Sequence, residues 1–340
     1  MAGPTFTIVM PAYNAARTIP ASIRSILSQT RPDFELIVVD DGSSDETVAV
    51  ASAFTSDPRV RIVKQENQGP GAARNNGITE GTAPYISLID SDDLWLPTYL
   101  ETMGAALDAD QSAGLAYTDA WVLDDRTGRI RKTTAMAYQN PPLPPPEDPV
   151  EFLKLLVERR NFVFTSSTVR RSTLDEIGAF NVLLKPSEDY ELWLRILASG
   201  YRAVRVAGNL AVYRKHSGSL STNQFALLLG EREAVRLVAE QYDVPEEIRR
   251  VAGRQKRKLD RLLAGMGDDR GLTASLQRAR ARAVRMKEFL AQPFVWHRRP
   301  PHEVAAVLAA AQADRHNARV SSPADVAGDG PEADDTRSRA

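Results

Sequence analysis

The segment YISLIDSDD, residues 85–93, is an apolar run that ends in three carboxylates. Such a run predicts a buried strand whose C-terminal end opens into the cleft where α/β proteins place their functional groups. In an extended chain, residues two apart point to the same side, so Asp90 and Asp92 would present their carboxylates together while Ser91 faces away. Two such groups repel each other unless a cation lies between them, and their oxygen atoms suit Mg²⁺ or Mn²⁺.

The same acids have a second interpretation as a helix N-cap, because Asp is common just before a helix and residues 94–97 follow directly. The segment taken alone is compatible with both interpretations.

The surrounding segments predict a sheet covered by helices. Apolar runs predict strands at 5–10, 34–39, 60–63 and 114–118, and apolar residues at helical spacing predict helices near 19–27, 71–78 and 98–109. Ser43 and Glu46 have the spacing of a capping box before a further helix. Strands that alternate with helices indicate an α/β fold with a mixed, mostly parallel sheet.

The middle of the chain predicts shorter elements. These are a hairpin turn at 124–128, a proline-rich surface loop at 140–146, a helix at 150–159, an extended segment at 162–169, a helix after 187–189, and strands at 201–206 and 210–213.

Composition limits the class of protein. The chain has 340 residues, 43% of them hydrophobic, and no cysteine, which excludes disulfides and thiolate chemistry and fits a reducing cytoplasm. It begins without the charged and apolar regions of a signal peptide, and no apolar run approaches the ~20 residues that span a bilayer. We therefore expect a cytoplasmic protein.

The C-terminal part differs from the rest. Residues 225–315 predict helices, and from Arg249 to Arg299 there are 15 Lys or Arg against 4 Asp or Glu, although the whole chain carries −1. A basic helical region of this kind suits a peripheral position on the anionic inner face of a membrane, or equally a solvated face of helices packed on the rest of the chain. Aromatic residues are not interleaved with these basic residues, so the region does not indicate nucleic-acid binding. Residues 316–340 predict a disordered tail.

Five motifs in order make residues 1–224 resemble the GT-A, Rossmann-like catalytic domain of the family 2 glycosyltransferases, which are inverting enzymes. They are IVMPAYN at 8–14, ELIVVDDGSSD at 35–45, NQG through ARN at 67–75, DSDD at 90–93 and ED at 188–189.

The resemblance implies a role for each matching residue. It places Pro11, Ala12, Tyr13, Asp41, Arg74 and Asp90 at the nucleotide, Asp92 and Asp90 at a Mn²⁺ or Mg²⁺ ion, and Asp189 as the catalytic base with Glu188 beside it. His216, in the segment YRKHS, would be a further metal ligand. An aromatic ring can stack on any base, and a carboxylate can accept the imide hydrogen of uracil or thymine.

The implied function is the metal-dependent transfer of one sugar from a nucleoside-diphosphate donor, with UDP or dTDP favoured, to a hydroxyl acceptor in glycan or glycolipid biosynthesis. Two alternatives stay open at this point. One is a non-catalytic nucleotide-sugar-binding or membrane-scaffold protein that retains the fold, and the other is a sugar-nucleotide pyrophosphorylase, whose Gly-rich basic loop is replaced here by PAYN at 11–14.

Overall fold

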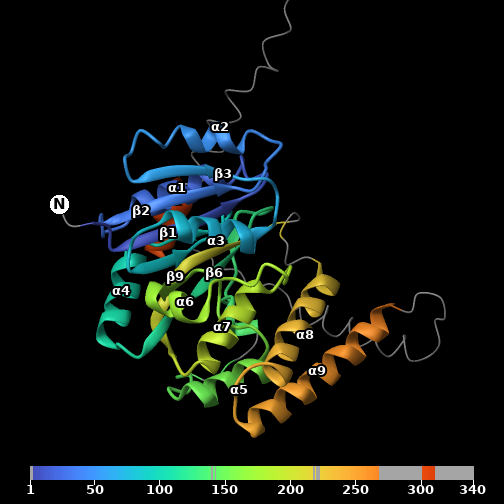
Figure 1. Ribbon diagram of the computed structural model, residues 1–340. Helices are drawn as coiled ribbons and strands as arrows, with labels where there is room; N and C mark the ends of the chain where they lie inside the picture. Colours follow the sequence, from blue (N-terminus) through green and yellow to red (C-terminus); the bar gives the residue numbers. More distant parts are fainter. Residues whose placement is uncertain are drawn as a thin grey trace, which may run out of the picture.

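The computed structural model describes residues 3–138, 141, 143–216, 219, 223–267 and 301–310. Strands and helices alternate through the first half, and helices dominate after residue 223 (Figure 1). In chain order the elements are β1 (Phe6–Ala12), α1 (Ile19–Leu27), β2 (Phe34–Asp40), α2 (Thr47–Ser52), β3 (Val60–Lys64), α3 (Pro70–Glu80), β4 (Tyr85–Leu88), β5 (Leu94–Trp95), α4 (Tyr99–Ala109), β6 (Ala113–Asp124), β7 (Arg129–Ile130), the 3₁₀ turn η1 (Met136–Tyr138), α5 (Pro149–Arg159), β8 (Ser167–Arg170), α6 (Arg171–Ile177), α7 (Glu188–Ala198), β9 (Arg202–Lys215), α8 (Gln224–Glu240), α9 (Glu246–Gly267) and a last helix over 302–310.

One mixed sheet runs through the molecule, in the order β3-β2-β1-β4-β8-β6-β9-β5 with β7 beside β6. The predicted parallel arrangement is confirmed for β3, β2, β1 and β4. β8 then pairs antiparallel with both β4 and β6, so the sheet is mixed from there on. Because parallel strands share one direction, the ends of β1, β2 and β4 meet at one edge of the sheet, where the motif residues lie.

Alternate residues of β1 pack into different cores. Phe6, Ile8 and Met10 pack with α1 and α4, whereas Val9 belongs to the core formed with α5, α7, α8 and α9. Helix α3 lies close against β1, since a Cβ at Gly77 would stand only 2.5 Å from a methyl carbon of Val9. This close approach holds Arg74 of the same helix near the sheet edge.

The predicted strands differ from the observed ones in two places. The two strands expected at 201–206 and 210–213 are a single strand, β9, because β6 stays paired with it through register shifts near Asp119 while Gly208 adopts a φ of +92°. The extended segment expected from 162 is a strand only over Ser167–Arg170, because Phe162 and Val163 enter the core. The hairpin turn at 124–128 is confirmed by the pairing of β6 with β7.

Two helix N-caps considered from the sequence, the capping box of Ser43 and Glu46 and the acids at 90–93, are not formed. Ser43 accepts a hydrogen bond from the Asn14 amide at 3.0 Å, and Asp45 instead accepts the Thr47 amide at the start of α2. The acids of 90–93 do not cap a helix either, because Leu94–Trp95 pairs with β9 and α4 begins only at Tyr99. The proline-rich loop lies partly outside the described residues, and its residues 143–146 form neither helix nor strand.

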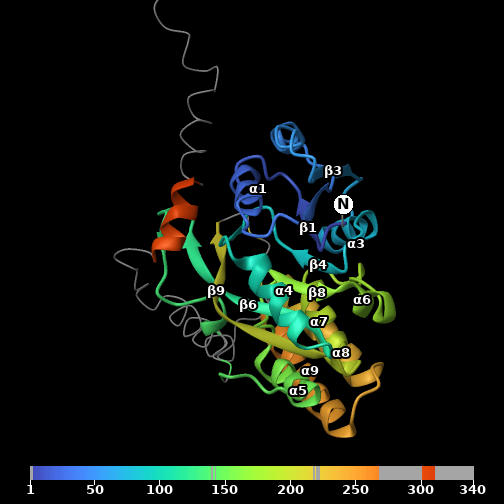
Figure 2. The same cartoon turned by 90° about the vertical axis from the view of Figure 1, so that its left-hand side faces the viewer.

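The C-terminal helices pack on the catalytic part. Ile248, Val251 and Leu259 of α9 are buried in the core that contains α5 and α7, and the basic residues Arg250, Arg254, Arg257, Lys258 and Arg261 lie on its exposed side. The helix over 302–310 lies beside the β6–β7 end of the sheet (Figure 2), where Val304 and Leu308 join an apolar cluster with Leu94 and Leu123. Within the described residues, no helix is both long and apolar enough to cross a membrane. The remaining basic residues, Arg278 to Lys287, and the expected tail at 316–340 lie outside the described residues.

Candidate functional site

The acidic segment after β4 forms a turn. The Asp93 amide donates to the Asp90 carbonyl at 3.1 Å, so the extended geometry expected for residues 90–92 is wrong. The turn gathers a third carboxylate, and ligand oxygens of Asp90, Asp92 and Asp93 all lie within 4.8 Å of one another. Asp93 is 1% exposed, and one of its oxygen atoms, Oδ2, has no hydrogen-bond partner.

The positive charge near these carboxylates does not offset their burial and mutual repulsion. Burial raises the pKa of Asp93 well above its ordinary value, and the neighbouring Asp92 and Asp90 raise it further. Burial also raises the pKa of Asp90, although Arg74 acts in the opposite direction. A group of acids that favours protonation is one that a cation would relieve.

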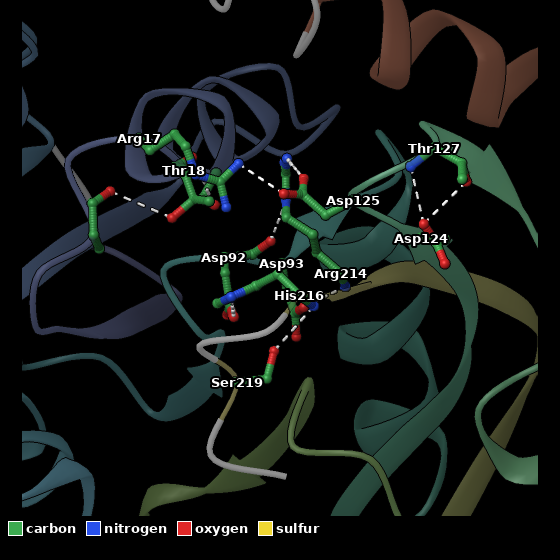
Figure 3. A network of polar contacts seen from close by, with 12 residues as sticks. Arg17, Thr18, Asp92, Asp93, Asp124, Asp125, Thr127, Arg214, His216 and Ser219 are labelled. Atoms are coloured by element: carbon green, nitrogen blue, oxygen red, sulfur yellow. Dashed lines mark hydrogen bonds and ion pairs between the residues drawn. The ribbon is translucent and has the colours of Figure 1, made fainter. Parts of the chain in front are cut away.

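His216 contacts this turn directly (Figure 3). Its Nε2 lies 2.8 Å from Oδ2 of Asp92, and both side chains are partly exposed. His216 follows the end of β9, and the pairing of β5 with β9 brings that strand alongside the acidic turn. The observed contact makes His216 a hydrogen-bond partner of Asp92, and its role as a metal ligand stays a prediction.

Arg74 joins the acidic turn to the start of α7. Its Nη2 donates to Asp90 at 2.6 Å, its Nη1 donates to Glu188 at 2.5 Å, and its side chain is 4% exposed. Although Arg is usually solvated on a helix surface, Arg74 is therefore buried between two acids. Glu188 is also buried, so a single guanidinium fixes two carboxylates that are 98 residues apart in sequence, at 90 and 188.

Asp189 is next to Glu188 in the first turn of α7 and keeps part of its surface exposed. Oδ2 accepts hydrogen bonds from Thr165 at 3.0 Å and from Asn161 at 3.3 Å. Burial and the Glu188 charge raise the pKa of Asp189 to about 6, against the opposing effect of Arg74. This carboxyl is therefore mostly ionised at neutral pH and able to accept a proton, and it takes up that proton at about pH 6.

Helix α8 supports the peptide that precedes these acids. Gly230 lies so close to the Pro186 carbonyl that a Cβ there would stand 1.9 Å from the oxygen. Next to it, Arg160 and Glu231 form an ion pair at 2.5 Å. The C-terminal helices therefore contribute to the placement of Asp189.

The predicted nucleotide side lies at the ends of β1 and β2. Tyr13 is 54% exposed, whereas Pro11 and Ala12 are buried in β1. Asn14 receives the amides of Ser44 and Asp45, which ties the loop after β1 to the loop after β2.

Asp41 is buried and holds the loop at 65–69. Oδ1 accepts from the Gln65 side chain and the Gln68 amide, and Oδ2 accepts from the Gly69 amide, each at 2.8 Å. A carboxylate has about four acceptor positions, so Oδ2 still has capacity for one further donor. The predicted contact between Asp41 and a base stays a prediction.

The structure thus brings Asp90, Asp92, His216, Arg74 and Glu188 into one chain of contacts, with Asp189 adjacent to Glu188. Sequence reasoning missed Asp93, Asn161 and Thr165 as members of this site. Asp93 is the third acid of the motif, but an extended chain would direct its side chain to the side opposite Asp92, and it was therefore left out of the predicted site.

Comparison with known proteins identifies the family of the chain. Residues 7–178 match the family described as Glycosyl transferase family 2. The succinoglycan biosynthesis protein ExoO of Rhizobium meliloti is 32% identical over 299 residues, which are 86% of this chain and 82% of that protein. The UDP-Glc:alpha-D-GlcNAc-diphosphoundecaprenol beta-1,3-glucosyltransferase WfgD of Escherichia coli is 30% identical over 64% of this chain and 80% of its own length.

A solved structure shows the same fold. It is the mannosyltransferase PcManGT of Pyrobaculum calidifontis in complex with GDP-Man and Mn²⁺, with a TM-score of 0.57 and 18% identity over 93% of this chain and 88% of that one. On the family match and the ExoO relationship together, the chain belongs to family 2 of the glycosyltransferases.

Proposed function

We propose that this enzyme transfers one sugar, with inversion, from a nucleoside-diphosphate donor to a hydroxyl acceptor, and that it depends on a divalent cation. The observation that carries the proposal is the double contact of Arg74, which brings the acidic turn and the first turn of α7 to one place. This link supports a site in which the acidic turn binds the cation and the first turn of α7 supplies the base for the same substrate.

The residues present fit a divalent cation. Asp90, Asp92 and Asp93 offer oxygen ligands, the pKa values of Asp90 and Asp93 are raised by burial and repulsion, and Asp93 Oδ2 is buried without a partner. We assign these three carboxylates to Mn²⁺ or Mg²⁺. Such an ion neutralises the negative charge that develops on a departing diphosphate.

Asp189 is the proposed general base. It accepts the proton of the acceptor hydroxyl while that oxygen bonds to the anomeric carbon and the bond from that carbon to the diphosphate oxygen breaks on the opposite side. Thr165 and Asn161 orient the carboxylate through their hydrogen bonds to Oδ2. Glu188 cannot share this role, because Arg74 occupies one of its oxygen atoms and the side chain is buried.

The donor nucleotide is proposed to lie between Tyr13 and Asp41. The exposed ring of Tyr13 is free to stack on a base, and Oδ2 of Asp41 is available for an imide N–H. Uracil and thymine carry that hydrogen, which favours UDP or dTDP sugars, and WfgD uses UDP-Glc according to its name. Guanine also has a ring N–H, so a GDP sugar is the competing donor to test.

The acceptor is proposed to be a lipid-linked sugar of a cell-surface glycan pathway. WfgD acts by name on a diphosphoundecaprenol-linked sugar, and ExoO functions in polysaccharide biosynthesis. An enzyme of this kind adds a single residue to a growing unit.

A thermal-shift series tests the proposal. UDP, dTDP and GDP, and their sugars, are added with and without Mn²⁺, because a ligand that binds the native protein raises its melting temperature. We expect the largest rise for a uridine or thymidine diphosphate with Mn²⁺, a loss of that metal effect in Asp92→Asn, and no loss in the exposed control Asp175→Asn. A shift that does not respond to Mn²⁺ in any combination would reject the metal-dependent function.

A further inference from the structure

Strand β9 brings two side chains to the acidic turn. Arg214 is the penultimate residue of β9, and His216 follows the strand by one residue, so the two are separated by two positions and are directed to the same side of an extended chain. Figure 3 shows both beside Asp92 and Asp93. His216 contacts the Asp92 carboxylate, and Arg214 contacts the backbone and the neighbouring acid.

Arg214 makes its contacts from a buried position. Its Nε donates to the Asp92 carbonyl at 2.7 Å, its backbone amide donates to Asp93 Oδ1 at 3.0 Å, and the residue is 2% exposed. The first bond fixes the peptide of the turn, and the second fixes one carboxylate of the three. The guanidinium therefore holds the backbone of the turn at Asp92, and the strand backbone beside it holds Asp93.

A third contact holds the guanidinium itself. Nη1 of Arg214 donates to Asp125 Oδ1 at 3.2 Å, and the other oxygen of Asp125 pairs with Arg17 at 2.8 Å. Asp125 follows β6, and its amide donates to the Lys215 carbonyl at 3.1 Å, which ties it to β9. On the opposite side of the turn, the Ser22 hydroxyl of α1 donates to the Ser91 carbonyl at 3.0 Å. The turn is thus held between α1 and β9.

We propose that Arg214 is a positioning residue that preorganises the acidic turn for its cation, with Asp125 fixing the orientation of the guanidinium. This inference rests on the proposed function only where it invokes the cation. Arg214 donates no group to the sugar or to the acceptor, and its side chain acts through the Asp92 carbonyl, while the backbone amide at position 214 holds the Asp93 carboxylate whatever the side chain.

Charge and geometry make opposite predictions for Arg214, which makes the proposal testable. As a positive charge, Arg214 repels a divalent cation, so a purely electrostatic role predicts tighter metal binding when that charge is lost. As a positioning residue, Arg214 uses its planar guanidinium to donate to the Asp92 carbonyl and to Asp125 at the same time, and the single ammonium of Lys cannot reproduce that geometry. Arg214→Lys keeps the charge and removes the fork, so it isolates the geometric contribution.

The experiment uses the full chain with Arg214→Lys, Asp125→Asn and the control Arg171→Lys. Arg171 is a matched control because it also donates to backbone carbonyls, those of Ala83 and Ile78 at the other end of β4. Hydrogen exchange of the peptide covering residues 89–96 is measured without metal, and Mn²⁺ affinity is measured by titration.

We expect Arg214→Lys to accelerate exchange in residues 89–96 by about 10- to 100-fold, because the turn loses a hydrogen bond donated by a charged group. We expect Mn²⁺ affinity to fall about 10- to 100-fold, as is typical when a residue that orients a ligand is removed. Asp125→Asn should produce a smaller change in the same direction, and the double variant should fall short of the sum of the two, because the residues are in contact.

Unchanged exchange of residues 89–96 in Arg214→Lys, or exchange equal to that of Arg171→Lys, would overturn the proposal whether or not the metal binds. Unchanged or tighter Mn²⁺ binding in Arg214→Lys would also overturn it, because Lys keeps the charge and a purely electrostatic role therefore predicts no loss of affinity. If the wild-type protein bound no Mn²⁺, the metal-dependent function would fail, and the exchange data would still decide the role of Arg214.

Discussion

Replacing Asp189 with Asn should abolish transfer and, at the same time, make the protein more stable at neutral pH. The pKa of this carboxyl rises from 3.8 to about 6 through burial and the Glu188 charge. An acid whose pKa is raised by folding costs stability once it is ionised, because the native state binds its proton more tightly than the unfolded state. Asn has no charge and avoids that cost.

The size of the effect follows from the pKa. At 1.36 kcal/mol per pKa unit, ionisation of Asp189 costs the native state about 3 kcal/mol at pH 8, as an upper value. The variant loses part of this gain, since Asn has a single acceptor oxygen while the carboxylate receives Tyr190 N on Oδ1 and Thr165 on Oδ2. That loss is about 1 kcal/mol. We therefore expect a net gain of about 1–2 kcal/mol, or roughly 4 °C in melting temperature.

The sign of the pH dependence is fixed by the same argument. Above pH 7 Asp189 is ionised in both the native and the unfolded state, and the full cost is present. As the pH falls through about 6 the native carboxyl takes up its proton, so the cost is about halved at pH 5 and disappears below about pH 4. The stabilisation by Asp189→Asn should therefore be largest at pH 8 and shrink toward pH 5.

The assay is a series of melting temperatures from pH 5 to pH 8, recorded for the wild type, Asp189→Asn and the exposed control Asp175→Asn. Donor-to-acceptor transfer is measured alongside, and the wild-type rate should fall below about pH 6 as the base takes up its proton. If Asp189→Asn were no more stable than the wild type at pH 8, the argument that the ionised Asp189 destabilises the native state would be refuted. Retained transfer would remove Asp189 from its role as the base.

Three further changes test other parts of the site. Gly230→Ala should lower stability by about 1–3 kcal/mol and reduce the transfer rate, because its Cβ would stand 1.9 Å from the Pro186 carbonyl oxygen; Gly265→Ala, with open space around it, is the control for both measurements. Tyr13→Ala should weaken nucleotide binding by about 1–3 kcal/mol in calorimetry, whereas Tyr13→Phe keeps the ring and should bind as the wild type does. The protein should float with anionic liposomes at low salt, and replacing the exposed Arg254, Arg257, Lys258 and Arg261 of α9 with Glu should abolish flotation; flotation that survives the change would assign membrane contact to another surface.

The regular elements of the first half follow from the sequence because their apolar residues recur at a definite spacing. Strands β1, β2 and β4 are apolar on both faces, and they lie where those runs predict. The approximate location of the site follows as well, since Asp90, Asp92 and Asp189 are motif residues. The strands and the placement of Asp90 and Asp92 at their ends use only local spacing and the rule that parallel strands end at one edge, whereas the inclusion of Asp189 rests on the resemblance to the glycosyltransferase family.

Contacts between distant segments could not be predicted in this way. Arg74 looks like an ordinary helix residue until Glu188 and Asp90 are placed beside it. Arg214 belongs to the motif at 213–217, yet only the pairing of β9 with β5 shows that it contacts the Asp92 carbonyl. Asp93 was missed because one hydrogen bond turns the chain back at residue 90, and residue spacing in an extended chain contains no sign of that turn.

The two halves of the site depend on different cores. The acidic turn is held from one side by α1, whose apolar residues pack in the core of Phe6 and Ile8, whereas α7 belongs to the core that includes α5, α8 and α9. Arg74 joins the halves through two short ion pairs in a buried position, where small displacements are costly. A change in the helices around α7 that displaces Glu188 should therefore also disturb Asp90 through Arg74, so the proposed proton abstraction and cation binding are coupled through this one side chain.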